Sequence, residues 1–223
     1  MILVYHREPS NGGRSLAQAL TQLGTSATNG CPKSKITHVV CWGYHVPEAL
    51  RRLPTLNGVL RVDKLTELIT LQRARVPTLE IWVPRAERHE GGRDIIQVST
   101  GSISHYTKFV NTIREFRVHV FDGKSIRVGI KVNSGSGHPW IRSHQQGWSL
   151  DYGSNCRVVI TNSVRVAARQ AIEAMSYDFG AVDVGIMEDG RPIVFEVNSA
   201  PGLDNENTAL AYARHIIQWS RSC

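Results

Sequence analysis

The 223-residue chain has few cysteines, no long apolar run, no internal repeat and no low-complexity segment. No stretch approaches the roughly 18 apolar residues of a membrane-spanning helix, so we expect no membrane partner. The apolar start at 1–5 reaches the polar run 6–8 too soon for a secretory signal. The 4 cysteines are scattered without C-x-x-C or zinc spacing, which favours free thiols in a reducing compartment. Together these absences predict a cytoplasmic protein.

Familiar catalytic and phosphate-binding patterns are missing as well. Asn11-Gly12-Gly13 invites comparison with a phosphate loop, but it lacks both the G-x-G-x-x-G spacing and the Gly-Lys-Ser/Thr ending. We therefore interpret it as a turn between a strand at 1–5 and a helix at 15–23. A loop at 25–34 and a second strand at 37–42 follow. No Ser-His-Asp or Cys-His arrangement is evident.

The charge balance is basic, with 26 Lys and Arg against 19 Asp and Glu, a formal charge of +7. Such a balance suits nucleic acid, and it equally suits a pocket that gathers a polyphosphate and an acidic substrate. The basic residues are spread along the chain rather than clustered, so a nucleic-acid partner is not favoured. With 41% hydrophobic residues, the chain can bury one sizeable core or a core plus a small lobe.

The most informative segment is 183–203, which reads DVGIMEDGRPIVFEVNSAPGL. Two apolar runs flank a turn of the Asp-Gly kind at 188–191, which predicts a β-hairpin. Asp183 and Glu196 would then lie near each other on adjacent strands, and alternation would place Glu196 and Asn198 on one face. Two carboxylates and an amide oxygen form the all-oxygen set that Mg²⁺ prefers beside phosphates, whereas the alternative is a solvated sheet face.

The segment EVNSAPGL, preceded by DFGAVDVG, resembles the metal-binding end of ATP-grasp ligases such as the ribosomal-protein glutamate ligases. With the rest of the chain, it is most similar to the short ATP-grasp proteins encoded by tailed bacteriophages. In that family an acidic residue, a Glu and an Asn two residues later hold Mg²⁺ against the ATP phosphates. The resemblance implies Asp183, Glu196 and Asn198 as metal ligands, with ATP and Mg²⁺ as cofactors.

A predicted helix at 63–75, capped by Asp63, resembles the helix that opens the first ATP-grasp lobe. Lys64 lies where the family often has a basic residue, although a lysine on an exposed helix face is usually only solvated. A strand at 81–83 and the run PRAERHEGGRDIIQV follow, and this run matches the family's glycine-rich flap over the phosphates. The flap residues that the resemblance assigns to nucleotide binding are Arg85, His89, Gly91 and Gly92.

The run EFRVHVFDGK alternates apolar and polar residues and turns at Asp122-Gly123, which predicts a half-buried hairpin. It resembles the entry strand of the second ATP-grasp lobe. The resemblance assigns the adenine edge to the preceding hinge at Lys108, Phe109 and Val110. It also assigns phosphate or substrate contacts to Arg117, to Lys131 and, in the segment IRSHQQGW, to Arg142 beside the γ-phosphate. Two further helices are predicted at 162–175 and 205–219.

The resemblance implies an α+β ATP-grasp fold of two lobes that sandwich ATP. The division expected is 1–62 for a reduced N-terminal α/β domain, 63–105 for the first lobe with its flap, and 106–223 for the second lobe with the hinge and metal site. The implied activity joins a carboxylate to an amine or related nucleophile on a small molecule or peptide. Three alternatives stay open at this stage: a small-molecule kinase on the same fold, a basic nucleic-acid-binding module and a metal-dependent nuclease.

Overall fold

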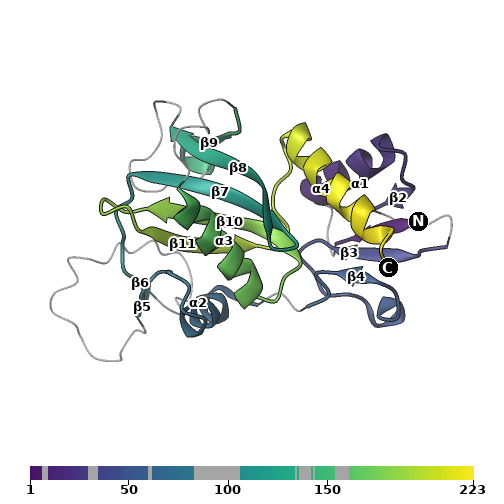
Figure 1. Ribbon diagram of the computed structural model, residues 1–223, viewed down its shortest axis with the longest axis horizontal. Helices are drawn as coiled ribbons and strands as arrows, with labels where there is room; N and C mark the ends of the chain where they lie inside the picture. The colour runs from purple at the N-terminus through teal and green to yellow at the C-terminus, as the bar shows by residue number, and fades with distance from the viewer. Residues whose placement is uncertain are drawn as a thin grey trace.

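A computed structural model of the chain describes residues 1–6, 10–29, 35–59, 62–82, 106–133, 135, 142, 144–153 and 161–223. Two regions lie side by side, and the two chain ends lie close together on the N-terminal one (Figure 1). No helix within these residues is long and apolar enough to cross a membrane. Of the cysteines, Cys41 and Cys223 are free, and the other two lie outside the described residues.

The N-terminal region is built on a parallel sheet of 4 strands in the order β2-β1-β3-β4. The predicted loop at 25–34 contains one of these strands, β2, which sequence reasoning missed because it is only 2 residues long. The elements of this region are β1 (Ile2–Tyr5), α1 (Asn11–Gln22), β2 (Ala27–Thr28), β3 (His38–Cys41), the 3-10 helix η1 (Glu48–Leu50) and β4 (Thr55–Leu56).

The predicted turn at Asn11-Gly12-Gly13 is wrong, because these residues form the first turn of α1. Ser10 caps the helix by accepting a hydrogen bond from the Gly13 backbone N–H at 3.2 Å. A Cβ on Gly12 would lie 2.7 Å from the carbonyl oxygen of Pro201 and 3.0 Å from the Trp42 indole nitrogen. Glycine is therefore present for close packing and not for a turn. Leu23, the last residue of the predicted helix, follows the end of α1 and is 37% exposed.

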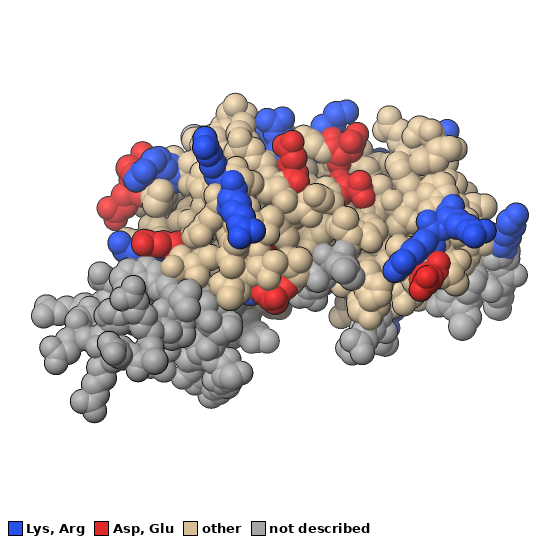
Figure 2. Space-filling model, turned by 90° about the horizontal axis from the view of Figure 1, so that it is seen from below, with Lys and Arg blue, Asp and Glu red and all other residues tan. Residues whose placement is uncertain are grey.

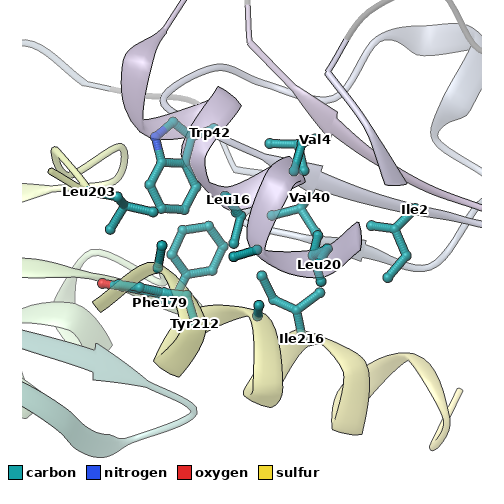
Figure 3. Packing of buried hydrophobic residues seen from close by; sticks show 14 of the residues in the cluster. Ile2, Val4, Leu16, Leu20, Val40, Trp42, Phe179, Leu203, Tyr212 and Ile216 are labelled. Carbon is teal, nitrogen blue, oxygen red and sulfur yellow. The ribbon is translucent and has the colours of Figure 1, made fainter. Parts of the chain in front are cut away.

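The closing helix α4 (Glu206–Ser220) packs beside α1 over the N-terminal sheet (Figure 1). The two helices and the sheet enclose an apolar core (Figure 3). In this core Trp42 stacks on Phe179 with ring centroids 5.3 Å apart, and it packs edge-on against Tyr212 at 5.7 Å. Asn57, buried in a left-handed backbone conformation, exchanges hydrogen bonds with the backbone of residues 178 and 179. These contacts fix the N-terminal region to the start of the next sheet.

The second region is a sheet of 5 strands in the order β11-β10-β7-β8-β9, and all neighbours are antiparallel. Both predicted hairpins are present, with turns at 122–123 and 188–191. Helix α3 covers one face of this sheet (Figure 1). The elements are β7 (Arg114–Phe121), β8 (Lys124–Asn133), the 3-10 helix η2 (His144–Gln146), β9 (Trp148–Asp151), α3 (Asn162–Ala174), β10 (Phe179–Ile186) and β11 (Pro192–Asn198).

Strand β11 is an edge strand, and a preceding part of the chain covers its outer side. The backbone N–H of Val194 donates to the carbonyl of Pro77 at 2.7 Å, and the Val197 N–H donates to the Glu67 carboxylate at 3.2 Å. Glu67 lies on α2 (Lys64–Arg73), which Asp63 caps as predicted. A two-stranded sheet of β5 (Ile81–Trp82) and β6 (Tyr106–Thr107) follows. The contacts to β11 satisfy backbone groups that an edge strand would otherwise expose.

Candidate active site

The face of the five-stranded sheet opposite α3 is polar. Strand alternation directs Glu115, Arg117 and His119 of β7 to this face, while Phe116, Val118 and Val120 pack in the core. The ladder pairs Arg117 with Asp183 of β10, and Asp183 with Glu196 of β11. Asp183 and Glu196 are thus opposite each other, as the hairpin predicted. The pairing register puts their charges in one row across three strands.

Asp183 is buried and held by two cations. The Arg117 guanidinium donates to both carboxylate oxygens, at 2.7 and 2.9 Å, and the Lys131 ammonium lies 3.3 Å away. Burial alone would raise the pKa of Asp183, but the hydrogen bonds and charge of Arg117, helped by Lys131, lower it. The carboxylate therefore stays ionised at neutral pH.

Glu115 connects this pair to Arg142. Its carboxylate lies 3.1 Å from the Lys131 ammonium and 3.6 Å from the Arg142 guanidinium, and it accepts the Thr112 hydroxyl at 3.1 Å. Arg142 also donates to the Thr112 carbonyl at 2.6 Å. Sequence reasoning gave Glu115 no role, although its two-residue spacing from Arg117 in REFRV was a usable signal. The result is an alternating chain of charges: Arg142, Glu115, Lys131, Asp183 and Arg117.

Glu196 has a different cation. The Lys64 ammonium of α2 lies 2.9 Å from the Glu196 carboxylate and 3.1 Å from Glu67. Lys64 is therefore ion-paired rather than only solvated. Glu67 is buried, and burial raises its pKa although Lys64 and the Val197 N–H oppose the change. Because Lys64 and Glu196 are both about two-fifths exposed, at 43% and 41%, their pairing is weak and easily exchanged.

Two cavities open on this face. The larger one, of about 620 Å³, is lined by Arg117, Lys131, Arg142, Asp183 and Glu196 among others. The smaller one, of about 330 Å³, lies between the start of α2 and the end of β11. It is lined by Glu196, Asn198 and Lys64, so that Glu196 stands at the boundary of the two cavities. The three cations expected in the cleft are thus brought together in one cavity.

The residues present fit a magnesium ion. A carboxylate has roughly four lone-pair positions, and Asp183 uses three of them, two for Arg117 and one for Lys131. Glu196 gives one oxygen to Lys64, and Asn198, whose side chain carries an amide oxygen, lines the smaller cavity. An all-oxygen donor set with open positions suits Mg²⁺. The described residues contain no cluster of three or more His, Cys, Asp or Glu side chains, so the ion would be held here by two carboxylates and one amide oxygen.

A buried histidine closes the face next to α4. His119 contacts the hydroxyl of Tyr212 through Nδ1 at 3.1 Å and the hydroxyl of Tyr152 through Nε2 at 2.9 Å. Burial, and the neighbouring Arg117 charge, lower the pKa of His119 to about 3. The ring is therefore neutral at physiological pH, and its role is to orient the two tyrosines. Sequence reasoning saw His119 only as a polar strand residue and did not find the tyrosines.

The predicted hinge residues do not line these cavities, and the predicted flap residues lie outside the described part of the chain. The hinge residues Lys108, Phe109 and Val110 connect β6 to β7, and none of them is among the described residues that line the two cavities. Lys108 is tied to β5 by a backbone hydrogen bond to Glu80 at 3.1 Å. The flap residues lie outside the described part of the chain; they are Arg85, His89, Gly91 and Gly92.

Charges of both signs lie on the face of the described residues that Figure 2 shows. On the face shown in Figure 2, Lys and Arg side chains lie interspersed with Asp and Glu, and they form no single basic patch. The cations of the site are also individually paired with carboxylates. A nucleic-acid-binding face would instead gather unpaired Lys and Arg to contact phosphates.

Several solved structures have the same architecture as this chain. No family model and no curated protein matches the chain. Among solved structures, the ATP-grasp ligase PsnB with its minimal precursor has a TM-score of 0.68 at 12% identity, over 97% of this chain and 98% of that one. D-alanine–D-alanine ligase from Bacillus anthracis with ATP has a TM-score of 0.66 at 13% identity, over 99% and 97%.

A third structure, the macrocyclase MdnC from Microcystis aeruginosa MRC bound to its precursor peptide MdnA, has a TM-score of 0.57 at 10% identity, over 98% of this chain and 100% of that one. Identities this low speak for the fold and not for the activity. Almost the whole of each chain is covered by these alignments. On this basis, and with its mixed parallel and antiparallel sheets, the chain has the α+β ATP-grasp fold.

Proposed function

We propose that the protein is an ATP-dependent ligase that joins a carboxylate to an amine or related nucleophile through an acylphosphate, with release of ADP and phosphate. One observation carries the proposal. On an ATP-grasp sheet, Asp183 lies opposite Glu196 beside a cavity of about 620 Å³ into which Arg117, Lys131 and Arg142 converge. That arrangement suits a polyphosphate, because phosphoryl transfer needs positioning and fixed positive charge rather than a covalent catalyst.

In this proposal the γ-phosphoryl group of ATP passes to a carboxylate oxygen of the substrate, and ADP leaves. The nucleophile then attacks the acyl carbon, the C–O bond to phosphate breaks, and the nucleophile loses its proton. Arg117, Lys131 and Arg142 orient the anionic groups during both steps. Magnesium, held by Asp183, Glu196 and Asn198, would neutralise charge on the phosphates.

Structures of similar fold support the choice of cofactors and reaction class. PsnB has been described with Mg and ADP and with AMPPNP, and the Bacillus anthracis enzyme with ATP. PsnB has been described in complex with a precursor peptide, and the Bacillus anthracis enzyme is a D-alanine–D-alanine ligase. Peptides and small molecules are the two substrate classes that we propose for this chain. The bacteriophage link and a cytoplasmic place of action remain predictions from the sequence.

Glu196→Ala is the sharpest test of the nucleotide site. Its only described ion pair is the exposed one with Lys64, so the fold should survive the change. We expect calorimetry to show loss of Mg²⁺-dependent ATP binding. Glu173→Ala, an exposed carboxylate on the far helix α3, is the matched control and should bind normally. Unchanged Mg-ATP affinity in folded Glu196→Ala would contradict the site.

Arg142→Lys separates a ligase from a protein that only binds nucleotide. Lysine keeps the charge but loses the planar fork that contacts Thr112 and faces the Trp148 ring at 5.1 Å. With a pool of amino acids and peptides as acceptors, we expect normal ATP binding and a roughly hundredfold slower release of ADP. Product masses decide the reaction class, since a ligase yields a condensed product and a kinase a phosphorylated one. Wild-type turnover by Arg142→Lys would assign the arginine a purely structural role.

A further inference from the structure

One side of the larger cavity is apolar, and it is formed at the edge of the sheet. Strand β9 carries Trp148 and Leu150, Tyr152 follows it, and all three residues line the cavity. The register places Leu150 opposite Lys131 and Trp148 opposite Asn133. Directly opposed residues of antiparallel strands share a face, so Trp148 and Leu150 lie on the same face as Lys131. We call Trp148, Leu150 and Tyr152 the apolar wall.

The sequence of this strand directs its apolar residues to the cavity. The segment WSLDY alternates apolar and polar residues, and Ser149 and Asp151 stand between the members of the apolar wall. In a half-buried strand the apolar side normally packs in the core. Here that side lines a cavity instead, and each member of the wall is only half-buried. The wall therefore presents apolar surface that a ligand can remove from water.

Contacts within the protein fix the apolar wall in place. The Tyr152 hydroxyl lies 2.9 Å from His119 Nε2, and the Tyr152 ring lies against Gly129, where a Cβ would be 2.8 Å away. A side chain on Gly129 would displace the ring. Burial raises the pKa of Tyr152 to about 12, although the Arg117 charge opposes the change, so the phenol is neutral. The wall is thus uncharged and preorganised for binding.

Cations of the site adjoin this wall. The Arg142 guanidinium lies over the Trp148 ring at 5.1 Å and donates to the Thr112 carbonyl at 2.6 Å. Arg117 and Lys131 line the same cavity. A ligand here therefore meets positive charge on one side and an apolar wall on the other. The phosphates of ATP have no apolar group for this wall, and its adenine is predicted to bind at the hinge, so the second substrate is left to supply one.

We propose that the apolar wall binds the side chain of the substrate whose carboxylate is activated, and that this substrate carries an α-carboxylate next to an apolar side chain. The inference deepens the proposed function, on which it rests, by naming the substrate class of the same cavity. In such a residue the carboxylate carbon and the first side-chain carbon share one Cα. The carboxylate can then face Arg142 while the side chain contacts Trp148 and Leu150. A polar side chain of the same shape would lose hydrogen bonds to water on binding there.

The test compares two probes of equal charge and similar shape, N-acetylleucine and N-acetylasparagine, which differ in the polarity of the side chain. Each is added to the full chain with Mg-AMPPNP, and binding is followed by ligand-observed NMR titration. We expect N-acetylleucine to bind roughly tenfold tighter or more. N-acetylleucinamide, which lacks the carboxylate, should bind more weakly than N-acetylleucine. Equal affinities of the wild type for N-acetylleucine and N-acetylasparagine would overturn the inference.

Leucine itself is titrated as well, because a free amino acid and the end of a peptide share this chemistry. Tighter binding of leucine than of N-acetylleucine supports a free amino acid as the substrate, and the reverse order supports a peptide. Failure of both to bind more tightly than N-acetylasparagine would again contradict the apolar wall.

Variants of Leu150 show whether the wall carries the preference. Leu150→Asn should abolish the preference for N-acetylleucine, and Leu150→Met should retain it because methionine keeps the surface apolar. Leu23→Asn is the matched control, since Leu23 is 37% exposed and does not line this cavity. It should bind both probes like the wild type. An unchanged preference in folded Leu150→Asn would show that the wall does not select the substrate.

Mg-ATP calorimetry on the same variants separates this inference from the proposed function. Normal Mg-ATP binding by Leu150→Asn, together with loss of the preference, supports a wall that serves the substrate. Loss of Mg-ATP affinity with the preference unchanged would assign the wall to the adenine and overturn the inference. If the wild type binds no Mg-ATP, the proposed function fails, whereas a Leu150-dependent preference for N-acetylleucine would still support a site for apolar carboxylates.

Discussion

The same strands form both faces of the five-stranded sheet, but apolar packing stabilises one face and ion pairs stabilise the other. On one face, residues such as Val118, Val182 and Val184 are fully buried against α3, and any apolar neighbour of suitable shape would serve. On the other face, Arg117, Asp183 and Glu115 are also largely buried, but each depends on a particular partner of opposite charge. The first face stabilises the fold, and the second prepares a site.

The comparison shows how buried charges on the polar face are stabilised when no ligand is bound. Each carboxylate expected near the metal already has a cation, Arg117 and Lys131 for Asp183 and Lys64 for Glu196. Desolvating these charges costs free energy, and pairing offsets it only if the geometry is good. Substitutions on the two faces should therefore differ in kind as well as in size, which the following changes measure.

Asp183→Ala should give the largest effect. It leaves the Arg117 guanidinium, only 22% exposed, without its bidentate partner. We expect a loss of about 3–5 kcal/mol in the free energy of unfolding, measured by urea denaturation. Restoring apolar packing with the double variant Asp183→Ala, Arg117→Met should recover part of it. A loss under about 1 kcal/mol would mean that the pair contributes little to the fold.

Ile172→Ala probes the apolar face. Ile172 of α3 is 2% exposed, and its Cδ1 lies where a Cβ on Gly180 would be 2.8 Å away. We expect a loss of roughly 3 kcal/mol from the lost burial and the cavity left behind. Unlike Asp183→Ala, this variant should keep its stability difference from wild type in high salt. Salt-dependent destabilisation would show that the two faces are coupled.

His119 should make stability depend on pH. Its pKa is lowered by burial to about 3 in the folded chain, against about 6.5 when unfolded. The unfolded chain therefore binds a proton first, and stability present above pH 6.5 is lost as pH falls toward 3. One pH unit below 6.5 this amounts to roughly 1.4 kcal/mol. Urea unfolding between pH 7.5 and 5 should show the slope, and His119→Gln should flatten it.

Lys64→Met should have the smallest effect on stability, about 1 kcal/mol, because Lys64 is itself 43% exposed and the Val197 N–H still donates to the buried Glu67 carboxylate. Removing the competing cation should nevertheless tighten Mg²⁺ binding in the absence of nucleotide, by no more than about fivefold. Calorimetric titration with MgCl₂ checks this, with Lys124→Met, on the turn side of β8, as the control. Weaker metal binding by Lys64→Met would show that the lysine assists the metal.

Local pattern determined the elements and part of the site. Alternation in REFRVHVF and the Asp-Gly turns predicted both hairpins, and the turn at 188–191 was enough to predict that Asp183 lies near Glu196. The alternating pattern is enough for these predictions, because successive side chains along a strand point to opposite faces of the sheet. The resemblance in EVNSAPGL led to the ATP-grasp fold, which comparison of structures confirmed.

Tertiary structure alone decided which charges meet. Lys64 and Glu196 are far apart in the sequence, and so are Arg117 and Asp183, so no local pattern could pair them. The same holds for α4, whose burial beside α1 depends on Gly12 allowing the chain at Pro201 to approach. Sequence determines the side-chain direction of each strand because that is a backbone property. Partner choice for a buried charge depends on chain segments that only folding brings together.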